Sequence, residues 1–178
     1  EADAGFRPDM ARLKAAITPR TRAIFLSNPN NPTGVVLNVE ELQGIAELAI
    51  AHELWVVVDE VYESLCYQRE HVSLASLPGM AERCVIVGSL SKSHAMTGWR
   101  IGWIVADPRL VKHAENLSLS MLYGLPGFVM AGALAALGAG RGGHRRAAAL
   151  CRPRRVRAAL APADAAQVPG APPDRQGS

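Results

Sequence analysis

The first 138 residues alternate between short, continuous apolar runs and longer segments whose apolar residues lie three or four positions apart. Continuous runs are typical of buried strands, and the wider spacing is typical of helices with one apolar face. The pattern predicts strands at residues 22–27, 54–58, 84–87 and 101–105. It predicts helices at residues 8–17, 38–52, 107–121 and 128–137.

Local residues mark where these helices begin. Pro8 is expected in the first turn of the first helix, because proline has no amide hydrogen to offer there. Asn38 is expected to cap the second helix, with Glu40 and Glu41 in its first turn. Asp107 is followed by Pro108, which again predicts a helix start.

The alternation of strands and helices predicts an α/β fold, a three-layer α/β/α arrangement around a mostly parallel sheet. The apolar run from Leu54 to Val58 predicts a strand buried on both faces. In such sheets ligands bind beyond the carboxyl ends of the strands. Three polar segments occupy such positions, namely residues 28–34, Asp59 and the loop after Val87.

The composition adds limits on the class of protein. The content of hydrophobic residues is 49%, which is typical of a globular chain, and no apolar run is long enough to span a membrane. The N-terminus lacks the charged-then-apolar pattern of a signal peptide. Cys66, Cys84 and Cys151 are far apart in sequence, so we expect reduced thiols in a cytoplasmic protein and no metal site.

Residues 139–178 differ from the rest of the chain. They hold eight arginines, no lysine and two acids, and 29 of the 40 are Gly, Ala, Arg or Pro. Such a segment buries too little apolar surface to offset its ordering entropy, so it is expected to be disordered or the product of a shifted reading frame. Because the net charge of +3 arises in this segment, it argues only weakly for a nucleic-acid partner.

Lys92 occupies a position that suits a chemical role better than packing in the core. Lys92 follows a predicted strand and is flanked by serines, with Arg100 eight residues later. A lysine amine condenses with aldehydes, and pyridoxal phosphate (PLP) is the common biological aldehyde bound in this way. The phosphate of PLP would need hydroxyl donors and a bidentate arginine, which Ser89, Ser91 and Arg100 can supply.

Three motifs in this order resemble one known family. They are Ser27-Asn28-Pro29-Asn30-Asn31-Pro32-Thr33-Gly34, then Asp59-Glu60-Val61-Tyr62, then Ser89-Leu90-Ser91-Lys92 with Arg100. Over residues 6–137 the chain resembles the class I and II aminotransferases, which are fold type I PLP-dependent enzymes. The resemblance implies a transaminase (EC 2.6.1.-) that moves an amino group from an amino acid to a 2-oxo acid.

The resemblance also implies a role for each motif residue. Lys92 would hold PLP as an aldimine and then move the proton between the substrate and the cofactor. Asp59 would keep the pyridine nitrogen protonated, and Asn31 and Tyr62 would contact the phenolic oxygen.

Arg100, Ser89 and Ser91 would bind the cofactor phosphate. Structural alternatives remain open: a helix cap for Asp59, a half-buried core position for Tyr62, a turn for Asn31 and loop capping for either serine.

The family pattern extends beyond this chain. Residues 1–138 resemble part of the large, PLP-binding domain, while the N-terminal arm, the small domain and its carboxylate-binding arginine have no counterpart in the sequence. Family enzymes are homodimers with shared sites. The sequence is therefore expected to be a fragment, and we do not expect full activity from it alone.

Two other functions fit the same residues. A PLP-dependent lyase could use the same scaffold, because the cofactor motifs do not select the bond that is broken. A remnant without cofactor, or the PLP-sensing part of a regulator, is the non-enzymatic alternative. A regulator would need a DNA-binding helix-turn-helix, and no such pattern occurs in the sequence.

Overall fold

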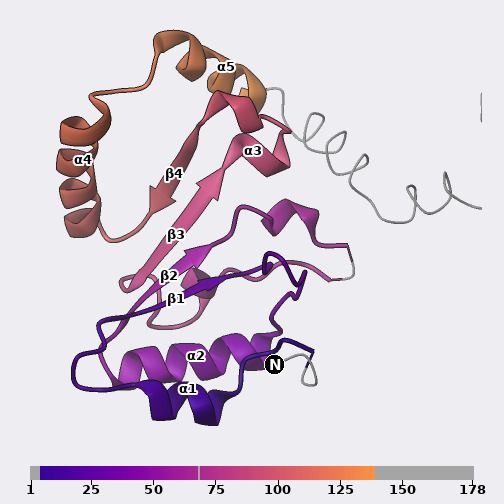
Figure 1. The fold of residues 1–178 in the computed structure, drawn as a ribbon, viewed down its shortest axis with the longest axis vertical. Coiled ribbons are helices and arrows are strands. Elements are labelled where there is room, and N and C mark those ends of the chain that lie inside the picture. The colour runs from indigo at the N-terminus through magenta and orange to yellow at the C-terminus, as the bar shows by residue number, and fades with distance from the viewer. Residues whose placement is uncertain (1–4, 68, 139–178) are drawn as a thin grey trace, which may run out of the picture.

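A four-stranded mixed sheet organises the computed structural model of the chain, which describes residues 5–67 and 69–138 (Figure 1). The strands are β1 (Ala23–Ser27), β2 (Trp55–Asp59), β3 (Cys84–Ser89) and β4 (Gly102–Val105). The α-helices are α1 (Met10–Ala16), α2 (Val39–Ala51), α3 (Leu90–Ser93), α4 (Pro108–Leu122) and α5 (Gly127–Gly138). The predictions made for residues 139–178 lie outside the described residues.

The sheet has the order β1-β2-β3-β4. The pairs β1–β2 and β2–β3 are parallel, whereas β3–β4 is antiparallel. The segment between β3 and β4 contains only α3 and one short 3-10 turn. This short connection lets β4 run back beside β3 in the opposite direction. The predicted α/β class with a mostly parallel sheet is confirmed.

The main core lies between α2 and one face of the sheet (Figure 1). On α2 the residues that are removed from water are Leu42, Ile45, Ala46 and Ala49. They pack against Val56 and Val58 of β2, which are 0% exposed. Burial of this apolar surface is the main source of stability in such a fold.

The prediction that the second strand is buried on both faces is wrong. Trp55 and Val57 point away from α2 and are only half-buried, and Phe25 in β1 is 75% exposed. Side chains alternate along a strand, and α1 and α2 pack on the face that carries Val56 and Val58. Among the described residues, only that face is fully removed from water along β2.

The beginnings of the helices follow the predicted caps with one exception. Met10 is the first residue of α1, and the carboxylate of Asp9 accepts hydrogen bonds from two backbone amides of its first turn. Pro8 therefore lies before the cap and not inside the helix. Asp107 caps α4 as expected, and its bond to Arg109 holds the pKa of the Asp107 carboxyl below its usual value.

Asn38 caps α2 through a reciprocal pair of hydrogen bonds. Its side chain accepts from the Glu41 amide at 2.8 Å, and its own amide donates to the Glu41 carboxylate at 2.7 Å. Asn38→Ala is expected to lower the free energy of unfolding by about 1 kcal/mol, because the Glu41 amide loses its acceptor. Urea unfolding measures this loss. Gln43→Ala, at an exposed position of the same helix, should change it by less than about 0.5 kcal/mol, and equal losses in the two variants would contradict the capping role.

Cys66 and Cys84 are free thiols. The pKa of the Cys84 thiol is raised to about 11, chiefly by burial and secondly by the negative charge of Glu60. Within residues 5–67 and 69–138, no helix combines the length and the apolar character that crossing a membrane requires.

Candidate functional site

The polar segments that follow β1, β2 and β3 meet at one edge of the sheet. Ser27 pairs with Asp59, and Asp59 pairs with Val87, so the three strands end at the same level. The backbone continues this register, because the Asn28 amide donates to the Asp59 carbonyl and the Glu60 amide donates to the Val87 carbonyl, each at 3.0 Å. This edge is where parallel sheets bind ligands.

Lys92 lies at this edge on a single helical turn. The sequence predicted a loop here, but residues 90–93 form α3, whose first amides are capped by Ser89. Leu90 anchors the turn in a second small core, being 1% exposed. The Lys92 side chain is half-buried, and its Nζ lies 5.4 Å from the centre of the Tyr62 ring.

Tyr62 is the point at which three predicted residues meet. The Asn31 side-chain amide donates to the Tyr62 hydroxyl at 3.5 Å, and the Lys92 amine lies over the ring. Asn31 is exposed and Tyr62 is half-buried, so this group is open to solvent. Residues separated by 31 positions in sequence are thereby brought into one site.

Asp59 ends β2 beside this group. One oxygen of its carboxylate accepts a hydrogen bond from the Val61 amide at 3.1 Å, which is the local capping contact left open by the sequence. The other oxygen makes no hydrogen bond within the described part of the chain. Among the residues of that part, no ion pair joins Asp59 to Lys92. The predicted partnership of Asp59 with a ring nitrogen stays a prediction.

The three predicted phosphate ligands form a second group. Ser89, Ser91 and Arg100 line one surface hollow of about 620 Å³, which lies between β3, β4 and α4 and does not include Lys92. The Ser89 hydroxyl already donates to the Ile101 carbonyl at 3.0 Å while it accepts from the Ser91 amide at 2.9 Å. In this structure Ser89 therefore performs the capping role that was the alternative to phosphate binding.

Arg100 is exposed and sits at the end of a 3-10 turn with φ 51°, a backbone conformation that is uncommon for residues other than glycine. Its Nη1 donates to the Thr97 carbonyl at 2.9 Å. The guanidinium keeps further donors for an anion, since five N–H groups are available on each arginine.

Sequence reasoning missed one polar pair at the same edge. Glu60 is buried, the His71 side chain is 9% exposed, and Glu60 Oε2 lies 3.3 Å from His71 Nε2. Glu63 lies beside them, and the three side chains bring ligand-type atoms within 4.8 Å of one another, although no metal site was expected. The sequence signal for this pair is Glu60, an acid close behind the apolar run that ends at Val58. An acid in a buried position requires a polar partner.

Comparison with known proteins places these motifs in context. A sequence model of the family described as aminotransferase class I and II matches residues 1–166. Residues 71–73, 75–83, 89–100, 115–117 and 121–124 also resemble arginine–pyruvate transaminases in sequence, and a relative of that kind is among the matches. The arginine–pyruvate transaminase AruH of Pseudomonas aeruginosa is 53% identical over 133 residues, which are 75% of this chain and 34% of that protein.

Other relatives show the same partial coverage. A probable N-succinyldiaminopimelate aminotransferase of Mycobacterium tuberculosis is 45% identical over 125 residues, 68% of this chain and 32% of that protein. A solved structure of a mutant Thermus thermophilus aspartate aminotransferase superposes with a TM-score of 0.82 at 35% identity, over 90% of this chain and 42% of that one. The chain thus spans about a third of the length of these curated relatives.

Proposed function

This chain belongs to the class I and II aminotransferases, and we propose that it carries the cofactor half-site of a PLP-dependent transaminase (EC 2.6.1.-). The reaction moves an amino group from an amino acid to a 2-oxo acid. Residues 1–138 would be part of the large, PLP-binding domain. The observation that carries the proposal is the half-buried Lys92 amine over the Tyr62 ring, at the edge where β1, β2 and β3 end.

The residues present fit the chemistry of PLP. When bound, PLP supplies an aldehyde that condenses with amines and a ring that withdraws electrons from the substrate. Lys92 offers the amine, and Asp59 offers a carboxylate oxygen that has no hydrogen bond in the described part of the chain. Asn31 and Tyr62 already share a hydrogen bond and would direct their polar atoms to the phenolic oxygen.

Each of these side chains would then have its own role in the reaction. Lys92 Nζ would accept the proton from the substrate Cα and return it to a different carbon, as a general base and then a general acid. Asp59 would hold a proton on the ring nitrogen. Ser91 and Arg100 would bind the phosphate from the hollow beside α3, and Ser89 would join them only by giving up its bond to Ile101.

The partners and the compartment are proposed on the same basis. The substrates would be an amino acid and a 2-oxo acid, with no nucleic-acid or membrane partner. A cytoplasmic location is supported by the free thiols Cys66 and Cys84. A homodimer of the intact enzyme is supported by large apolar side chains left exposed on α4 and α5, for example Met121 at 76% and Phe128 at 73%.

Borohydride trapping tests the proposal. The chain has three lysines, Lys14, Lys92 and Lys112, so PLP that is reduced onto the protein can be assigned to one of them by peptide mass. We expect the modification at Lys92 at PLP concentrations too low to label the exposed Lys14 and Lys112. Equal labelling of all three lysines would show that no specific site exists in this chain.

A further inference from the structure

The chain changes direction at the end of β2, and this is where the proposed cofactor residues are presented. Val56 and Val58 face the core under α2, so Asp59 faces the other side of the sheet and Glu60 faces the core side again. Glu60 then starts a tight turn, since the Glu63 amide donates to its carbonyl at 2.9 Å. Tyr62 is the third residue of that turn.

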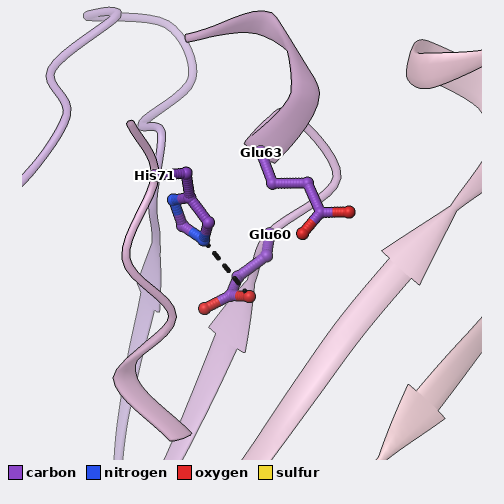
Figure 2. A group of neighbouring side chains, drawn as sticks. All are labelled: Glu60, Glu63 and His71. Carbon is purple, nitrogen blue, oxygen red and sulfur yellow. Dashed lines mark ion pairs between the residues drawn. The ribbon is translucent and has the colours of Figure 1, made fainter. Parts of the chain in front are cut away.

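The side chain of Glu60 lies against the ring of His71 (Figure 2). The side chains of Glu60 and His71 are only 4% and 9% exposed, and Nε2 and Oε2 are 3.3 Å apart. Within the described residues, Glu60 Oε1 and both ring nitrogens of His71 lack a hydrogen-bond partner, so the approach of Nε2 to Oε2 is a close polar contact without hydrogen-bond geometry. A buried carboxylate without a polar partner is strongly unfavourable, and His71 is the group that the described residues place against Glu60.

The backbone connects this buried pair to the proposed site. The Glu60 amide is bonded to the Val87 carbonyl of β3, and the Val61 amide is bonded to the Asp59 carboxylate. A shift of the Glu60 side chain would therefore move the strand end that carries Asp59 and the turn that carries Tyr62.

We propose that Glu60 and His71 form a positioning pair for the cofactor site, which fixes the turn at residues 60–63 so that Asp59 and Tyr62 face Lys92. This inference rests on the proposed function, since it concerns the same site. The pair touches neither substrate nor cofactor and acts through the backbone of the turn. Its neighbour Glu63 is exposed and makes no ion pair with His71 in the described residues, so it provides a matched control.

Two measurements on the 178-residue chain test the pair. The first is amide hydrogen exchange without PLP, comparing Val61 and Glu63 in the turn with Val56 in β2, whose amide is bonded to the Arg83 carbonyl. Glu60→Gln and His71→Gln are each expected to speed exchange at Val61 about tenfold more than at Val56.

The second measurement is the dissociation constant of PLP. It is expected to rise about tenfold in both variants, because small displacements of cofactor-facing groups are costly. Glu63→Gln should leave both quantities unchanged.

Each other outcome has a distinct meaning. If the variants lose thermal stability while turn exchange and PLP affinity follow the control, the pair is only a stabilising contact and the inference fails. If Zn²⁺ raises the melting temperature of the wild-type chain and Glu63→Gln removes that effect, the three residues form a metal site and the inference also fails. If the wild-type chain does not bind PLP, the proposed function fails, while exchange at Val61 still decides whether the pair fixes the turn. If neither variant folds, wild-type exchange decides: the inference fails if Val61 and Glu63 exchange as fast as unstructured amides.

Discussion

Lys92→Ala is expected to abolish covalent trapping of PLP, whereas Lys14→Ala and Lys112→Ala should leave it intact. The reason is that only Lys92 combines a half-buried amine with polar neighbours at the sheet edge. Lys14 is exposed on α1, and Lys112 is exposed and paired with Glu115 at 3.0 Å. The measurement is the protein mass after borohydride reduction, together with the absorption band that PLP acquires on condensing with an amine.

The Lys92 variant should remain folded. Alanine is the most favourable residue for a helical interior, and α3 is anchored by Leu90 and the Ser89 cap rather than by the lysine. Far-UV circular dichroism and a thermal melt check this point. Trapping that persists in the folded Lys92→Ala chain would contradict the assignment of the lysine, and trapping lost together with the fold would require Lys92→Arg, which keeps a long cationic side chain but cannot condense with PLP.

Asp59→Asn is expected to weaken PLP binding by about ten- to a hundredfold. Charged hydrogen bonds contribute about 1.5–3 kcal/mol, and that is the difference between a carboxylate and an amide facing a protonated ring nitrogen. The substitution is nearly isosteric, and asparagine keeps an oxygen that can accept from the Val61 amide. A titration of the absorption band with PLP measures the affinity.

The control for Asp59→Asn is stability. Because the capping bond can survive, the free energy of unfolding should change by less than about 0.5 kcal/mol. The opposite pattern, unchanged PLP affinity with a clear loss of stability, would show that Asp59 acts as a cap of the following turn and not as a partner of the cofactor.

The elements that sequence reasoning located best are those whose signals are local. The cap at Asn38 and the apolar spacing of Leu42, Ile45, Leu48 and Ala49 predicted α2. The structure confirms the helix and its cap, with Leu48 half-buried and the other three buried. Capping and helical spacing depend on residues within about one turn, so they can be read without knowledge of the fold. The lysine loop was harder, because a single turn such as α3 has too few residues to show a period.

The candidate site divides in the same way. The motifs predicted which residue types lie at the strand ends, and the comparisons confirm the family to which they belong. The use of each side chain was open: Ser89 could cap or bind phosphate, and in the structure its hydroxyl is engaged by Ile101 and Ser91. Whether the Ser89 hydroxyl caps locally or binds a phosphate depends on the position of β4. The motif itself does not encode that position.

By itself the sequence determined the α/β class, most strand and helix positions and the family, because these follow from local periodicity and from ordered motifs. The set of cofactor residues that it also predicts stays a prediction. Only the tertiary structure decided that Tyr62 meets both Asn31 and Lys92, that one face of β2 stays half-exposed, and that Glu60 lies against His71. Each of these facts requires two segments distant in the chain to be adjacent in space. Strand register and helix packing set that adjacency, and no local pattern specifies it.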